Sequence, residues 1–180
     1  MFADGTLSAR RDQLKSNPSG NTQYTPALPF LYGMKEQLTM MEEEGMENVW
    51  ARHSRLANGT RRAVAAWGLD MLCKEPRWYS DALTVIETPQ SIDSTKVVKT
   101  AYAKYNLSLG AGLSEVAGKV FRIGHLGNMD DIMCLSSLAG TEMTLLDCGI
   151  DIKPGSGVGA AVKYFQETAG VIPTRESLIQ

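Results

Sequence analysis

Histidines, cysteines and long apolar runs are all scarce in this chain of 180 residues. It contains two histidines and three cysteines, and the cysteines are widely and irregularly spaced (Cys73, Cys134 and Cys148). This pattern argues against a metal centre or a disulfide framework and favours a reducing compartment. No apolar run is long enough to cross a bilayer. The net charge of −2 also gives no overall field that would attract nucleic acid or an anionic membrane.

The two ends of the chain lack clear targeting signals. Residues 1–21 are polar, and no apolar segment follows them, which argues against a secretory signal and only weakly permits a transit peptide. The last four residues, Ser177-Leu178-Ile179-Gln180, differ from the Ser-Lys-Leu peroxisomal type. We therefore expect a cytoplasmic protein, with a mitochondrial or peroxisomal location left open. We expect residues 1–21 to form an arm ahead of the folded part.

Two long helices are predicted after this arm. Thr25 is suited to cap a helix that has Pro26 in its first position, and apolar residues keep helical spacing as far as Gly45. A second helix is predicted from residue 46 to residue 66. Because one glycine joins two helices of this length, residues 22–67 are predicted to be connector helices between parts of a larger body.

From residue 68 to residue 180, the pattern changes to alternating strands and helices. Strands are predicted at residues 83–86, 107–109 and 119–124, and helices at residues 94–105, 130–147 and 160–168. The predicted inward-facing residues of the first two helices are Val97, Val98, Ala101, Tyr102, Ile132, Leu135, Leu138, Met143 and Leu146. This order of elements predicts a small α+β domain, in which the helices cover one face of a short sheet.

Arg122 interrupts an otherwise apolar strand. Alternation places Phe121 and Ile123 on one face of that strand and Arg122 on the other. A guanidinium in such a position needs an anionic partner, because an unpaired buried charge is costly. Two interpretations stay open: an internal ion pair with one of the 20 acidic residues, or a contact with the carboxylate of a ligand.

Two glycine-rich segments are ambiguous. Gly110-Ala111-Gly112 permits close approach of the backbone to a ligand, but it also suits a plain tight turn. Residues 155–159 superficially resemble a phosphate-binding loop, yet they lack the lysine and hydroxyl pair of a P-loop. We therefore expect residues 155–159 to lead into a terminal helix.

The segment around Arg122 resembles the C-terminal signature of class V, fold-type-I pyridoxal-phosphate aminotransferases, and most closely their serine–glyoxylate group. It reads Gly118-Lys119-Val120-Phe121-Arg122-Ile123-Gly124-His125-Leu126-Gly127. Other segments follow in the order of the family: Tyr24-Thr25-Pro26, Leu31-Tyr32-Gly33, Glu43-Glu44-Gly45, Ala51-Arg52-His53, Ala66-Trp67-Gly68-Leu69, Leu107-Ser108-Leu109-Gly110 and Leu138-Ala139-Gly140. The resemblance covers residues 20–173 and implies the C-terminal half of such an enzyme.

The resemblance also implies roles for three residues. Arg122 corresponds to the arginine that binds the substrate α-carboxylate, a task that suits a two-pronged donor. Thr25 corresponds to a threonine that contacts the phosphate of pyridoxal 5'-phosphate, usually that of the neighbouring subunit. Relatives often have an aromatic residue where this chain has Thr22, and Tyr24 is expected to compensate for it.

According to the resemblance, the residue that forms the Schiff base is not in this chain. In the family, that lysine belongs to a large domain upstream of Tyr24. The one lysine before this position, Lys15, has surroundings unlike the family motif. Because proton transfer belongs to the family lysine, His125 is expected to be structural, and His53 to be a packing or capping residue. No catalytic residue and no metal ligand are predicted in this chain.

Three functions follow as hypotheses. The chain is part of an aminotransferase that moves the amino group of serine or alanine to glyoxylate, inactive alone, and forms a homodimer or associates with a lysine-bearing large domain. Alternatively, it is one subunit of a split aminotransferase. The third hypothesis is a non-catalytic dimerisation or interaction module. The amino donor stays open, because the family builds the side-chain pocket largely from its other half.

Overall fold

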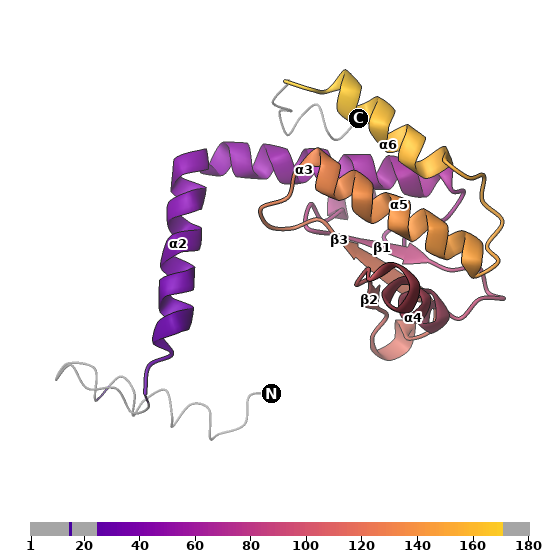
Figure 1. The fold of residues 1–180 in the computed structure, drawn as a ribbon, viewed down its shortest axis with the longest axis horizontal. Helices are drawn as coiled ribbons and strands as arrows, with labels where there is room; N and C mark the ends of the chain where they lie inside the picture. The colour runs from indigo at the N-terminus through magenta and orange to yellow at the C-terminus, as the bar shows by residue number, and fades with distance from the viewer. Residues whose placement is uncertain (1–14, 16–24, 171–180) are drawn as a thin grey trace. The chain divides into compact units, whose positions relative to one another are not determined.

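The computed structural model describes Lys15 and residues 25–170. The chain divides between Glu44 and Gly45 into two compact units, which are described separately. The first unit contains helix α2 (Leu28–Glu44), and the second contains the remaining named helices and strands (Figure 1). None of the described helices combines the length and the apolar character that a membrane span requires.

Helix α2 ends where the sequence predicts, but it begins later. Gly45 follows it with a φ of 85°, a conformation that favours glycine. The predicted capping by Thr25 is wrong, because the helix begins at Leu28. The N–H of Leu28 donates to the carbonyl of Pro26 at 2.9 Å, so a turn precedes the helix. No residue of α2 is buried.

Helix α3 (Met46–Ala66) has the predicted bounds and lies at the centre of the second unit. Its residues Leu56, Ala63 and Val64 are fully buried in one core cluster. Helices α5 (Asp131–Asp147) and α6 (Ser156–Glu167) pack against it, and the three lie side by side in Figure 1. The sequence groups residues 46–66 with the preceding helix, whereas in the structure they form part of the core of the second unit.

A three-stranded antiparallel sheet lies under these helices. Strands β1 (Leu83–Glu87), β2 (Gly110–Ala111) and β3 (Val120–Gly124) are arranged in the order β1-β3-β2. The buried side chains of the sheet pack with those of α3, α4 (Ser94–Tyr105), α5 and α6 in the core cluster. The predicted α+β class, with helices on one face of a short sheet, is confirmed. Two 3-10 helices, η2 (Pro76–Trp78) and η3 (Ser114–Val116), lie in connecting segments.

The strand predicted at residues 107–109 is wrong, because this segment completes helix α4. Asn106 adopts a left-handed conformation with a φ of 52°, and the N–H of Leu107 donates back to the carbonyl of Ala101 at 3.1 Å. This backbone bond is of the kind that ends helices. Strand pairing therefore begins only at Gly110.

The inward faces predicted for α4 and α5 are partly wrong. Val97 and Ala101 of α4 are buried, but Tyr102 is 68% exposed. In α5, Leu138 is buried, as predicted, whereas other residues of the predicted stripe are exposed: Ile132, Met143 and Leu146.

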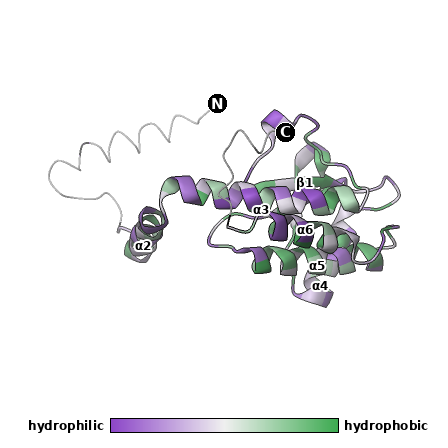
Figure 2. Ribbon diagram, turned by 90° about the horizontal axis from the view of Figure 1, so that it is seen from above, coloured by the Kyte–Doolittle hydropathy of each residue, from purple (hydrophilic) through white to green (hydrophobic). Residues whose placement is uncertain are grey.

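Polar residues occupy the inward face of α5 and obscure its apolar period. Thr141 and Thr144 are fully buried, and their hydroxyls donate to the carbonyls of Ser137 and Gly140, both at 2.8 Å. Because these bonds stay within the helix, the hydroxyls enter the core without being left unpaired. In Figure 2, hydrophilic and hydrophobic residues are accordingly interleaved along the helices of the second unit.

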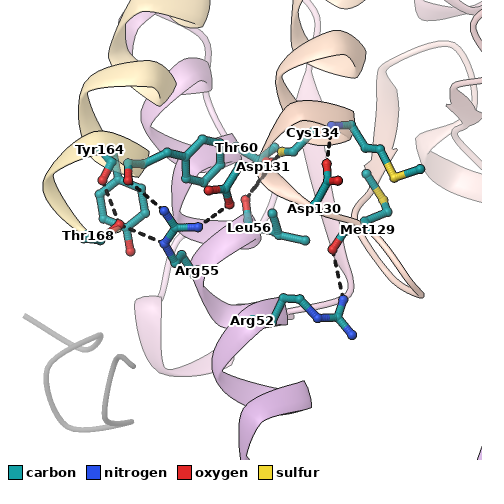
Figure 3. A network of polar contacts seen from close by, with 12 residues as sticks. Arg52, Arg55, Leu56, Thr60, Met129, Asp130, Asp131, Cys134, Tyr164 and Thr168 are labelled. Atoms are coloured by element: carbon teal, nitrogen blue, oxygen red, sulfur yellow. Dashed lines mark hydrogen bonds and ion pairs between the residues drawn. The ribbon is translucent and has the colours of Figure 1, made fainter. Parts of the chain in front are cut away.

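Arg55 joins the three central helices (Figure 3). Its guanidinium pairs with the carboxylate of Asp131 and donates to Thr168 Oγ1 at 3.0 Å and to the carbonyl of Phe165 at 2.7 Å. One turn earlier, Arg52 donates to the carbonyls of Gly127 and Met129. The two arginines therefore connect α3 with both α6 and the loop that follows β3.

The carboxylate of Glu142 occupies the N-terminus of α6. It accepts from Trp67 Nε1 at 2.8 Å and from the backbone N–H groups of Gly155, Gly157 and Val158. The segment 155–159 is therefore the start of a helix, as expected, although α6 begins at Ser156, earlier than predicted. An anion does bind this N-terminus, but the chain itself supplies it.

The pH dependence of stability should report on Glu142. Burial raises its pKa, but the bonds from Trp67 and the backbone N–H groups outweigh burial and hold the pKa below the ordinary value of 4.5. The stabilisation is therefore present above pH 4.5 and lost as the pH falls through the lowered pKa.

We expect Glu142→Gln to lower the free energy of unfolding by about 1–3 kcal/mol near pH 7, because the amide group cannot accept all of these bonds. Denaturant unfolding in steps from neutral pH to about pH 3 measures this effect. The difference in the free energy of unfolding between the wild type and the variant should become smaller in acid. A difference that stays the same at every pH would show that the Glu142 carboxylate does not stabilise the fold in this way.

Candidate functional site

Arg122 lies in the middle of the central strand of the sheet. In β3 it stands directly opposite Val85 of β1 and Gly110 of β2. Its neighbours Phe121 and Ile123 are 0% and 2% exposed on the face that the helices cover. Arg122 itself is partly exposed on the other face. The predicted alternation along this strand is confirmed.

Within the part of the chain that the structure describes, Arg122 has no acidic partner. Its Nε is buried and has no hydrogen-bond acceptor there. Glu87, the acidic residue of β1, is already paired with Lys74 at 2.8 Å. A buried N–H without an acceptor costs about 1–3 kcal/mol, so such a group in a folded protein needs an explanation. The described residues therefore give no support to an internal ion pair of Arg122. The other interpretation, a contact with the carboxylate of a ligand, stays open.

The glycines before β3 approach other parts of the chain closely. A Cβ added to Gly110 would stand 2.9 Å from Arg122 Nε and 3.0 Å from Arg122 Cβ. A Cβ added to Gly112 would meet the carbonyl oxygen of Val116. The sequence leaves two interpretations of residues 110–112 open, a close approach to a ligand and a plain tight turn. The structure shows a short strand at Gly110, which makes room for the Arg122 side chain, and a tight approach at Gly112.

The two residues predicted to bind the cofactor phosphate belong to the first unit, whereas Arg122 belongs to the second. Thr25 is exposed, lies three residues before α2 and belongs to the first unit. Tyr24 lies outside the described residues. Of the three predicted site residues, Arg122 alone is placed within the second unit.

Both histidines hold the backbone near the end of β3. His125 is fully buried; its Nδ1 donates to the carbonyl of Asp81 at 3.0 Å, and its Nε2 lies 2.9 Å from Thr84 Oγ1. Burial lowers the pKa of His125 to about 4. His53 Nδ1 donates to the carbonyl of Val49 at 2.6 Å, and its Nε2 accepts from the N–H of Gly127 at 3.0 Å. These contacts support the structural roles expected for both residues.

A cavity of about 360 Å³ lies beside β1, and its walls are mainly apolar. Its charged wall residue, Arg61, donates to the carbonyl of Ser80 and pairs with Asp81 at 3.0 Å. The guanidinium of Arg61 also lies 5.0 Å from the centre of the Tyr79 ring. Because Arg61 is satisfied inside the chain, Arg122 is the stronger candidate for binding an anion.

Comparisons with known proteins relate the chain to aminotransferases. No family model matches it. A serine–glyoxylate aminotransferase of Methylorubrum extorquens is 54% identical over 156 residues, covering 87% of this chain and 39% of that protein. An L-aspartate–glyoxylate aminotransferase of Paracoccus denitrificans is 42% identical over 158 residues, covering 88% of this chain and 40% of that protein.

A solved structure agrees with these similarities. The ureidoglycine–glyoxylate aminotransferase of Bacillus subtilis superposes with a TM-score of 0.76 at 25% identity, over 86% of this chain and 41% of that chain. The chain therefore spans about two fifths of the length of the curated relatives that it matches.

The stability of an Arg122 variant distinguishes the two interpretations of this residue. We expect Arg122→Met, which keeps an apolar stem, to leave the free energy of unfolding within about 0.5 kcal/mol of the wild type or to raise it. Arg55→Met is the control, because it breaks the pair with Asp131 and should cost about 3 kcal/mol. Urea denaturation measures both variants. A loss at Arg122 as large as that at Arg55 would indicate an internal ion pair.

His125 should make the fold sensitive to acid. Its pKa lies at about 4 in the folded protein against 6.5 ordinarily, so the neutral ring is favoured by folding. The contribution of the neutral His125 ring to the free energy of unfolding is complete above pH 6.5. It falls by about 3 kcal/mol as the pH drops towards 4. We expect His125→Gln to flatten the stability profile between these pH values. An unchanged slope, measured by thermal unfolding across this range, would contradict the assignment.

Proposed function

We propose that this chain, which is homologous to part of the serine–glyoxylate aminotransferases, supplies the group that holds the substrate carboxylate in such an enzyme. The observation that carries the proposal is that the guanidinium of Arg122, at the centre of the sheet, has no acidic partner among the described residues. A planar guanidinium offers parallel N–H donors that match the two oxygens of a carboxylate. Both an amino acid and glyoxylate carry that group.

Glyoxylate is the proposed amino acceptor. The three proteins compared above have glyoxylate in their names and differ in the amine: serine, aspartate and ureidoglycine. A common acceptor suits a shared carboxylate contact, whereas the donors differ in their side chains. We propose serine as the donor, because the serine–glyoxylate relative is 54% identical, with alanine as the alternative.

Pyridoxal 5'-phosphate is the proposed cofactor. When bound, it supplies an electron sink for the reacting α-carbon. Among the described residues, Thr25 offers an exposed hydroxyl that suits a phosphate oxygen. Tyr24 is proposed as a second phosphate contact. We place the Schiff-base lysine in the part of the relatives that this chain does not span.

The described residues bind and orient rather than transfer protons in this proposal. Arg122 binds the carboxylate and fixes its direction from the centre of the sheet. His53 and His125 hold the backbone that follows β3, and the pKa of His125 lies too low for a base near neutral pH. No proton-transfer step is assigned to either histidine.

A homodimer, or association with a lysine-bearing large domain, forms part of the proposal. Helix α2 supports it, because large apolar side chains of this helix are exposed: Leu28, Phe30, Leu31, Tyr32, Met34, Leu38 and Met40.

The division into an arm (1–21), connector helices (22–67) and a small domain (68–180) stays a prediction. The three cysteines are free thiols, which suits the reducing cytoplasm proposed as the location. A non-catalytic interaction module is the alternative that the same exposed side chains of α2 favour.

A chimeric enzyme tests the proposal. The matched part of the Methylorubrum extorquens enzyme is replaced by this chain, and amino transfer from serine to glyoxylate is measured with added pyridoxal phosphate. We expect activity in the chimera. Arg122→Met should lower kcat/KM by about 30- to 160-fold, which corresponds to about 2–3 kcal/mol of charge-assisted hydrogen bonding.

The matched control in the same chimera is Arg77→Met. Arg77 lies beside the exposed ring of Trp78, at 5.0 Å from the ring centre, and is not part of the sheet. Its loss should change kcat/KM by less than about two-fold. A chimera that binds the cofactor but transfers no amino group from serine, alanine or aspartate would contradict the proposed reaction. Full activity of Arg122→Met would contradict the role of Arg122.

A further inference from the structure

We infer that Gly110 is a positioning residue, which sets the direction of the Arg122 guanidinium by having no side chain. That this direction serves carboxylate binding rests on the function proposed above. The structural part of the inference, namely that Gly110 determines where Arg122 lies, stands on the geometry of the sheet.

Strand pairing places Gly110 and Arg122 directly opposite each other. Side chains of directly opposed residues point to the same face of a sheet, and a Cβ added to Gly110 would lie 3.0 Å from Arg122 Cβ. Any side chain at position 110 would therefore compete with Arg122 for space. The distance of 2.9 Å between Arg122 Nε and the position of an added Cβ shows that Arg122 already occupies this space.

The other flank of Arg122 is different. Val85, its partner in β1, has a branched side chain on the same face, and such side chains are stiff. Arg122 therefore lies between a fixed side chain and an open position, and it leans over the open one. In this position Arg122 Nε is buried against β2, and the described residues provide no hydrogen-bond acceptor for it. The terminal nitrogens are then directed by the way the side chain crosses Gly110.

Backbone conformation does not explain the glycine. Gly110 is absent from the positive-φ glycines of the described chain, so a left-handed conformation is not the reason for a glycine here. An alanine methyl group would meet Arg122 Nε, which a change of rotamer can move away, and Arg122 Cβ at 3.0 Å, where the strands must give by a few tenths of an ångström. We therefore expect Gly110→Ala to fold and to displace the guanidinium.

The NMR signal of the Arg122 Nε–H group tests the inference on the full 180-residue chain. The signal is assigned by its loss in Arg122→Lys, and the burial of Nε should protect it from exchange with water. We expect Gly110→Ala to shift this signal and to speed its exchange, while amide signals outside the sheet stay in place. No protected Arg122 signal in the wild type would overturn the inference.

Gly124→Ala is the matched control. Gly124 lies two residues after Arg122 in β3, on the same face of the sheet, and nothing lies within 4 Å of the position of an added Cβ. The control therefore makes the same substitution in the same sheet without touching Arg122. The inference is wrong if Gly110→Ala moves the Arg122 signal no further than Gly124→Ala does.

A double-mutant cycle in stability keeps the inference testable if Gly110→Ala weakens the fold. Thermal unfolding should show that Gly110→Ala costs more stability when Arg122 is present than in an Arg122→Ala background, in which the side-chain atoms beyond Cβ are absent. An equal cost in both backgrounds would mean that Gly110 serves the backbone alone. Failure of the proposed function is seen separately, as a chimera in which Arg122→Met keeps full activity while Gly110→Ala still moves the Arg122 signal.

Discussion

Antiparallel pairing of β3 with both of its neighbours is the constraint on which the candidate site depends. The register sets Arg122 opposite Val85 and Gly110 and turns Phe121 and Ile123 towards the helices. A shift of one residue would bring the guanidinium into the apolar core, so burial of the other face fixes the register strongly. The side chain that meets a ligand in the proposed function is thus held in place by the side chains that fill the core.

Three charged groups of the second unit show how this site differs from its surroundings. Arg55 has Asp131 as its partner, and the carboxylate of Glu142 has Trp67 and the start of α6. Arg122 has a buried Nε and no acceptor in the described part of the chain. Folding alone therefore accounts for the first two groups, whereas the third is the group to which we assign the proposed carboxylate contact.

Much of the fold could be predicted from the sequence, because glycines and apolar periods mark the ends of the long helices. The bounds of α3 and α4 and the alternation at Arg122 follow from such local patterns. The segment 107–109 and the inward face of α5 could not be predicted in this way. The first is determined by a backbone hydrogen bond from Leu107 to α4, and the second by threonines whose hydroxyls donate to carbonyls within α5. Neither feature changes the apolar pattern of the sequence. The role of Gly110 also depends on strand register, which only the tertiary structure provides.

The most direct test of the account is a crystal structure of the chimeric enzyme with serine bound. The account predicts that the serine carboxylate accepts two hydrogen bonds from the Arg122 guanidinium, which lies across Gly110 as it does in the free chain. A carboxylate held by other residues, with Arg122 turned towards an acidic side chain of its own chain, would contradict the central claim.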